Sequence, residues 1–78
     1  MIEKMLKIMR KTKGLSQFQL AKILNIAQTT LSGYETKYSN PTFDVIETIA
    51  KNCDFEIIFR NKKTKEEYTT ESIKRIDI

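Results

Sequence analysis

The sequence predicts a mainly α protein, with four helices followed by a C-terminal β-strand or β-hairpin. Three observations lead to this fold class. Apolar residues recur with helical spacing in four segments of the first 53 residues, capping and turn residues separate these segments, and the spacing changes to alternation after Cys53. A chain of 78 residues has room for one domain with a thin core, and such chains often gain burial by association.

The first helix is expected over residues 2–13. Ile2, Met5, Leu6 and Met9 follow the i, i+3, i+4, i+7 spacing of one apolar stripe. Gly14 is suited to the position just after the helix, where a left-handed residue commonly ends it. Leu15 then returns the chain to the core.

Two short amphipathic helices, Ser16–Leu24 and Gln28–Thr36, are expected on either side of a tight turn. Ser16 can cap the first helix, with Gln19 completing a capping box. Asn25 suits the left-handed position of the turn. The inner faces would be formed by Leu20, Ala21, Leu24, Leu31 and Tyr34, with Ile26 at the corner. This pattern predicts a helix-turn-helix, whose second helix enters the DNA major groove.

The fourth helix is expected to follow the polar loop Lys37–Asn40. Pro41 ends the loop, Thr42 can cap the helix, and Asp44 lies in its first turn. Its predicted inner stripe consists of Phe43, Ile46, Ile49, Ala50 and Cys53.

The residues after Cys53 alternate as a strand does. Phe55, Ile57 and Phe59 would face one way, and Glu56, Ile58 and Arg60 the other. Asn61–Lys65 can turn the chain, and Glu66–Thr70 can form a second strand. Residues 71–78 fit either one helical turn with Ile73 and Ile76, or a loose tail. We expect residues 1–54 to form the helix-turn-helix domain and residues 55–78 a β extension of the same compact unit.

The net charge of +4 lies entirely in the helical part. Residues 1–53 hold eight Lys/Arg and four Asp/Glu, whereas residues 54–78 hold six of each. An excess of positive charge on a helix-turn-helix is typical of a phosphate-binding surface, although a solvated lysine-rich face would look the same.

The composition argues against an enzyme. The chain has no His, which is the commonest general base and metal ligand, and no Gly-rich phosphate loop. Its single cysteine, Cys53, lies on an apolar stripe and suits a core position in a reducing cytoplasm better than a nucleophile. We expect no cofactor, no metal, no membrane span and no signal peptide.

The chain resembles the phage-repressor (Cro/Xre) helix-turn-helix family, over residues 2–53. The resemblance is carried by Leu15-Ser16-Gln17, Leu20-Ala21, Leu24-Asn25-Ile26, Gln28, Leu31-Ser32, Tyr34-Glu35 and Asn40-Pro41-Thr42. It implies a four-helix lambda-repressor-like domain. Two residues depart from the family pattern: Asn25 stands where Gly is usual, and Ala27 stands where Ser or Thr usually caps the recognition helix.

The candidate base-reading residues lie in the second helix of the motif. Gln28 can donate to and accept from adenine, Thr29 can meet a thymine methyl, and Ser32 lies one turn further on. Gly33 stands where relatives often carry a base-reading side chain, and here it can only permit close approach or be silent. Both Gln28 and Thr29 could instead be ordinary exposed polar residues. Thr30 is expected to face the DNA backbone.

The expected phosphate contacts surround this helix. They are Gln17, Lys11, Lys13, Thr30, Lys37, Asn40 and Thr42, although each lysine could serve only for solubility. The resemblance further implies that Gln17 braces Gln28.

These residues predict a sequence-specific, dimeric repressor of double-stranded DNA with a pseudo-palindromic operator. Four helices followed directly by a strand resemble the DNA-binding antitoxins of kinase-type toxin–antitoxin pairs, which adds a toxin as an expected partner. A stand-alone repressor and a protein-interaction adaptor without DNA reading remain open. Dimerisation is expected to use Phe55, Ile57, Ile58 and Phe59.

Overall fold

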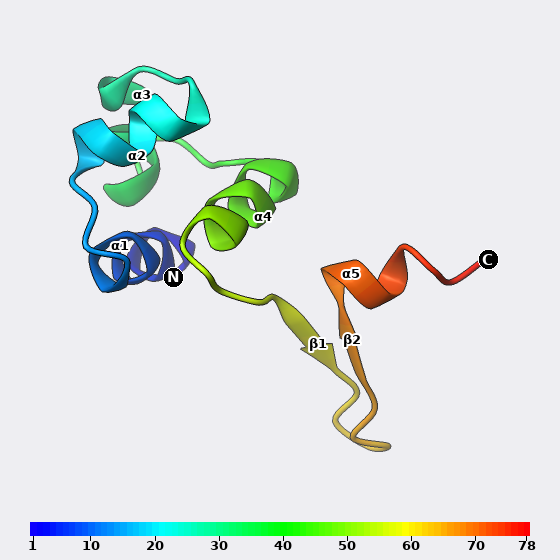
Figure 1. Cartoon of the computed structure of the whole chain (residues 1–78). Helices are drawn as coiled ribbons and strands as arrows, with labels where there is room; N and C mark the ends of the chain where they lie inside the picture. Colours follow the sequence, from blue (N-terminus) through cyan, green and yellow to red (C-terminus); the bar gives the residue numbers. More distant parts are fainter.

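The computed structural model describes all 78 residues and confirms the predicted order of four helices and an antiparallel hairpin (Figure 1). A one-turn fifth helix follows the hairpin. The elements are α1 (Ile2–Thr12), α2 (Gln17–Leu24), α3 (Gln28–Glu35), α4 (Phe43–Asn52), β1 (Ile58–Arg60), β2 (Glu67–Thr69) and α5 (Thr70–Ile73). The longest of the helices, α1, has 11 residues, and none has the length and apolar character needed to cross a membrane.

The core lies where the first four helices meet. Each helix contributes one large side chain that is fully enclosed: Leu6, Leu20, Leu31 and Ile49. Met9, Ala21, Ala50 and Cys53 complete the buried cluster. All eight residues belong to the predicted inner stripes, so the helical periodicity identified the core correctly.

The predicted caps and the turn of the helix pair are also confirmed. The Ser16 hydroxyl accepts from the Gln19 amide at 3.0 Å, and the Gln19 side chain accepts from the Ser16 amide at 2.8 Å. Asn25 is left-handed, with φ 57°. The Thr42 hydroxyl accepts from the Val45 amide at 3.3 Å and begins α4.

The strands are shorter than the alternation predicted. β1 pairs with β2 only from Ile58 opposite Thr69 to Arg60 opposite Glu67. The earlier residues Phe55 and Ile57 pack on the helical core instead, which carries this segment away from β2. Thr70 leaves the strand because the Thr69 hydroxyl caps α5 through the Ser72 amide.

Phe43 is not an inner residue of α4, as the stripe predicted. It is 48% exposed, because it is the first residue of the helix and lies beyond the edge of the core. Its ring lies 6.0 Å from the ring of Phe59, centroid to centroid. Val45 and Ile46 pack against the core. Phe43 therefore belongs to the junction between the helices and the hairpin.

The hairpin projects from the helical body (Figure 1). The radius of gyration is 13.9 Å, with extents of 40 × 22 × 22 Å, whereas a compact chain of this length has a radius of about 11.5 Å. An ion pair between Lys51 of α4 and Glu71 of α5, at 3.2 Å, links the segment after the hairpin to the helices. Exposed ion pairs of this kind contribute little to stability.

Candidate nucleic-acid interface

The outward face of α3 carries small polar side chains. At 3.6 residues per turn, this face lies opposite the buried Leu31 and Glu35. Its members are Thr29, Ser32, Gly33 and Thr36, with Gln28 at one edge and Thr30 at the other. Gln28, Thr29 and Thr30 are exposed, and Ser32 and Gly33 are half-buried. The structure thus brings the four predicted base-reading residues together on one helix.

A shallow hollow of about 460 Å³ adjoins the N-terminus of α3. Its lining includes Phe18 and Lys22 from α2 and Ala27 and Gln28 from the start of α3. Ala27 makes no side-chain cap to α3, as its methyl group requires. Lys22 was not among the predicted phosphate contacts, although it lies on the last turn of α2, just before the tight turn.

The loop after α3 folds back over the end of that helix. The Ser39 amide donates to the Gly33 carbonyl at 3.2 Å, and the Thr36 hydroxyl donates to the Ser32 carbonyl at 2.9 Å. Lys37 adopts a left-handed conformation with φ 67°. Lys37 and Asn40 are exposed beside α3, whereas the hydroxyl of Thr42 is occupied as the cap of α4.

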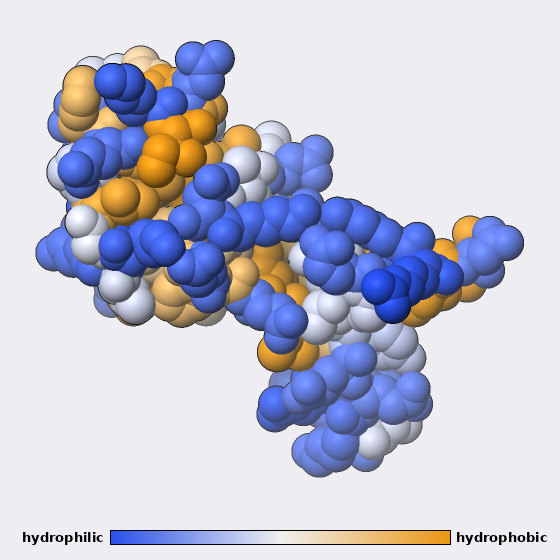
Figure 2. All heavy atoms as spheres, viewed as in Figure 1, coloured by the Kyte–Doolittle hydropathy of each residue, from blue (hydrophilic) through white to orange (hydrophobic).

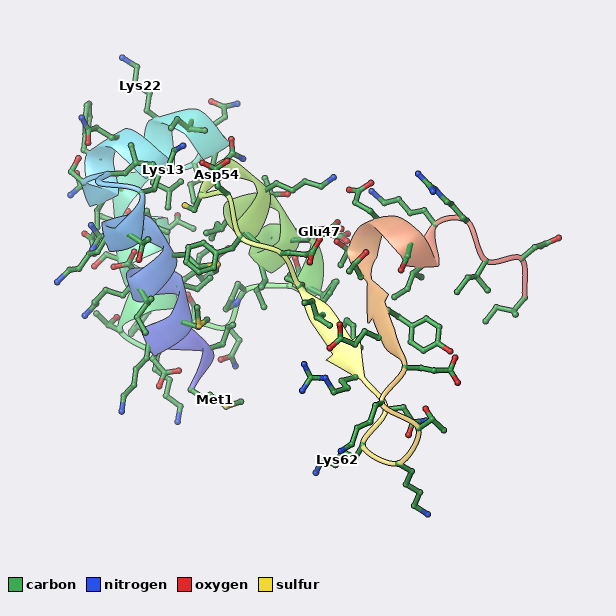
Figure 3. The ribbon with its side chains drawn as sticks, turned by 60° about the horizontal axis from the view of Figure 1, so that its bottom comes forward. Met1, Lys13, Lys22, Glu47, Asp54 and Lys62 are labelled. Carbon is green, nitrogen blue, oxygen red and sulfur yellow. The ribbon has the colours of Figure 1, made fainter.

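The two predicted phosphate ligands at the end of α1 differ in their surroundings. Lys11 is exposed. The Lys13 ammonium is paired with the Asp54 carboxylate, and Figure 3 shows the two side chains meeting. The hydrogen bond that Lys13 donates to Asp54 raises the pKa of Lys13. Asp54 offsets the charge of Lys13, so Lys11 carries more of the free positive charge of this edge.

A buried ion pair fixes α3 to the rest of the fold. Arg10 of α1 donates from Nε to Glu35 Oε2 at 2.7 Å and from Nη2 to Glu35 Oε1 at 3.0 Å. Arg10 also donates to the Leu15 carbonyl at 2.9 Å, and Gln17 of α2 donates to Glu35 Oε1 at 3.2 Å. Glu35 is the last residue of α3. The network therefore joins three helices at the end of the predicted reading helix.

The sequence did not predict that Arg10 and Gln17 bind the Glu35 carboxylate. Burial alone would raise the pKa of Glu35, but hydrogen bonds from Arg10 and Gln17 outweigh it and hold the pKa below its ordinary value. The available signal was the position of Arg10, four residues after Leu6 on the buried stripe of α1. The side-chain amide of Gln17, a predicted phosphate contact, donates to Glu35 in this structure.

The chain has few other side chains suited to catalysis or metal binding. Cys53 is buried, and this burial raises the pKa of its thiol and keeps it protonated. No cluster of three or more His, Cys, Asp or Glu side chains is placed to hold a metal ion.

Comparison with known proteins identifies the helical part. Residues 6–58 match the family model described as helix-turn-helix, HTH_3. The match begins within α1, includes α2, α3 and α4, and ends at the first residue of β1. No curated protein and no solved structure matches the chain.

Proposed function

This chain belongs to the helix-turn-helix family HTH_3, a family of DNA-binding domains, and we propose that it is a sequence-specific transcriptional repressor that acts as a dimer. The proposal rests on the polar residues of the outward face of α3. This face presents Gln28, Thr29 and Ser32 on a helix whose opposite side is anchored in the core. We expect the protein to act in the cytoplasm, together with the DNA that it binds.

The N-terminal turn of α3 is proposed to read base edges. In a helix-turn-helix the first residues of the second helix contact the bases, and an amide side chain matches adenine N6 and N7. Gln28 and Thr29 are exposed on this turn, and neither makes a side-chain hydrogen bond within the chain that would have to be broken. They are therefore free to pair with bases.

Gln28→Ala and Thr29→Ala should each reduce discrimination between the operator and random DNA. A good base contact contributes about 1–3 kcal/mol of discrimination. Both side chains are exposed, so the melting temperature should change little. Competition binding with selected and scrambled duplexes measures the effect. Lys62→Ala, at the tip of the hairpin, serves as the control (Figure 3). Full operator preference in both α3 variants would show that another surface reads the bases.

Lys37→Ala should weaken binding to all DNA sequences alike. Each neutralised phosphate contributes about −0.9 to the slope of log K against log salt concentration, so the variant should lower the magnitude of that slope by about one for each protomer. Lys62→Ala removes the same charge far from α3 and should leave the slope unchanged. Equal slopes for wild type and Lys37→Ala would remove Lys37 from the interface, and salt-independent affinity would contradict DNA binding altogether.

The exposed hairpin supports the proposed dimer. A two-stranded hairpin is marginal in water, and its open edges expose unpaired backbone groups. Ile58 and Phe59 of β1 are 45% and 50% exposed. Figure 2 shows hydrophilic atoms over the hairpin turn and apolar atoms near its base and on the tail. We propose that β1 pairs with β1 of a second copy across a two-fold axis.

An apolar groove beside β1 extends this surface. It has a volume of about 460 Å³ and lies between α1, α4 and the segment that leads into β1. The groove is lined largely by Ile2, Met5, Phe43, Ile46, Phe55 and Phe59. A stable interface buries about 1,200 Å² or more in total, which pairing of three-residue strands does not supply. The second copy is therefore proposed to cover the groove as well.

An antitoxin role is the second candidate function. The hairpin and the apolar groove lie apart from α3, so a toxin could bind there while α3 contacts DNA, as an autoregulating antitoxin requires. The product of the adjacent reading frame, co-expressed with the protein, tests this role. If the chain neutralises a toxic kinase-like or nuclease-like product, the role is supported. If that product is harmless and does not bind the chain, the stand-alone repressor is favoured.

A further inference from the structure

Gly33 leaves a gap in the outward face of α3, and the following loop fills it. A Cβ atom placed on Gly33 would lie 3.0 Å from Ser39 Oγ and 3.8 Å from Tyr38 Cδ2. The loop therefore lies against the helix where the Gly33 side chain is missing. The Tyr38 ring is within van der Waals range of that position.

The backbone holds Tyr38 in a defined place. On one side, the Ser39 amide is bonded to the Gly33 carbonyl at 3.2 Å. On the other, Lys37 makes a left-handed turn immediately after Thr36, whose hydroxyl is bonded to the Ser32 carbonyl. The backbone on both sides of Tyr38 is thus held against α3, and Tyr38 itself is 91% exposed.

We propose that Tyr38 supplies, from the loop, the DNA contact that Gly33 cannot supply from the helix. The inference rests on the proposed reading of DNA by α3. An exposed tyrosine ring beside the reading helix can contact a thymine methyl group with its apolar edge and a phosphate with its hydroxyl. Tyr38 is a specificity-determining residue on this account.

The expected position of the contact follows from the helix geometry. Gly33 lies four residues beyond Thr29, which is about 6 Å along the helix axis at 1.5 Å per residue. The Tyr38 contact should therefore fall on a different base pair from the contact made by Thr29.

The test uses duplexes with about 20 randomised base pairs, from which wild-type protein selects a consensus. Tyr38→Ala should lose preference at one position of each half-site, with a fall of about 5- to 10-fold, the lower end of what one base contact supplies. Tyr38→Phe keeps the ring and should retain that preference. A consensus duplex with uracil in place of thymine at that position lacks the methyl group, and the difference in affinity between wild type and Tyr38→Ala should be smaller on it than on the thymine duplex.

A second pair of variants tests the placement of the ring. Gly33→Ala puts a methyl group against the loop, and Ser39→Ala removes the nearest atom. Gly33→Ala should reduce preference at the Tyr38 position, and Ser39→Ala added to it should restore part of the loss. Thr29→Ala is the control, since it should relax a different position.

Three results would overturn the inference while leaving the proposed function intact. Tyr38→Ala could bind with unchanged preference, it could lose affinity equally for all sequences, or uracil substitution could leave its difference from wild type unaltered. In each case the wild-type consensus and the effect of Thr29→Ala would remain. Failure of wild-type protein to select any consensus would instead contradict the proposed function itself.

Discussion

Glu35→Gln should destabilise the protein by about 3–5 kcal/mol, because it leaves the buried Arg10 guanidinium without its counter-charge. Arg10 and Glu35 side chains are 10% and 0% exposed, so water cannot replace the missing partner. For a domain of this size the loss corresponds to a fall in melting temperature on the order of 12–40 °C. Thermal unfolding followed by circular dichroism measures it.

The matched control replaces both partners. Arg10→Met combined with Glu35→Leu removes the two charges together and should be near neutral or stabilising, since no uncompensated charge remains buried. If Glu35→Gln melts at the wild-type temperature, the ion pair does not hold α3 in place. If the double replacement is as unstable as the single one, the loss reflects packing and not charge.

Acid should remove the same stabilisation in wild type. The pKa of Glu35 is lower in the folded protein than in the unfolded chain, where it is about 4.3. The ion pair therefore contributes its full stability above the unfolded pKa, and this contribution is lost as the pH falls through the folded pKa. The stability difference between wild type and Glu35→Gln should shrink over that range. A difference that stays constant as the pH falls well below the unfolded pKa would contradict the assignment of the low pKa to Glu35.

Removal of the hairpin should abolish tight association and lower operator affinity by about 10²- to 10⁴-fold, the gain that linking two half-sites supplies. Truncation after Asp54 removes β1, β2 and α5, and should leave a helical protein that associates weakly. It also removes Phe55 and Ile57, which cover part of the core. Truncation after Ile57 keeps both residues and separates the loss of the interface from a loss of stability.

Sedimentation at several protein concentrations measures the association state of each chain. The full chain should be a dimer, and the chain that ends at Ile57 should be a folded monomer. A point variant, Ile58→Asp, should have the same effect, because Ile58 is 45% exposed and its replacement places a charge in the proposed interface. Tight dimers of either variant would place the interface on the helices.

The sequence predicted the helical part well because its signals are local. Helical spacing identified the core leucines, and short-range capping rules identified Ser16, Asn25 and Thr42. The residues of α3 were predicted together because they lie within two turns of one helix. Such features depend on neighbours three or four residues away, which a single sequence displays.

Most of the failures involve contacts that are distant in the sequence. Arg10 and Glu35 are separated by 25 residues, and nothing local shows that their charges meet in the core. Lys13 is paired with Asp54 across 41 residues. The start of β1 was misplaced because Phe55 and Ile57 pack on the helices, and their segment does not pair with β2. The contact between Tyr38 and the Gly33 position depends on the left-handed backbone of Lys37. No pattern in the sequence predicts that conformation at a lysine.

The most direct test of the central claim, that α3 is the surface that meets DNA, is a map of backbone amide chemical shifts during titration with a 20-base-pair duplex. Non-specific affinity of about 10⁻⁴–10⁻⁶ M is enough for the measurement, so no operator is needed. The largest changes should fall on Gln28–Ser32 and Lys37–Asn40, they should diminish as salt is raised, and Lys62 and the hairpin tip should not move. The claim would be contradicted if α3 stayed unchanged while the groove between α1, α4 and β1 responded, or if no amide shifted.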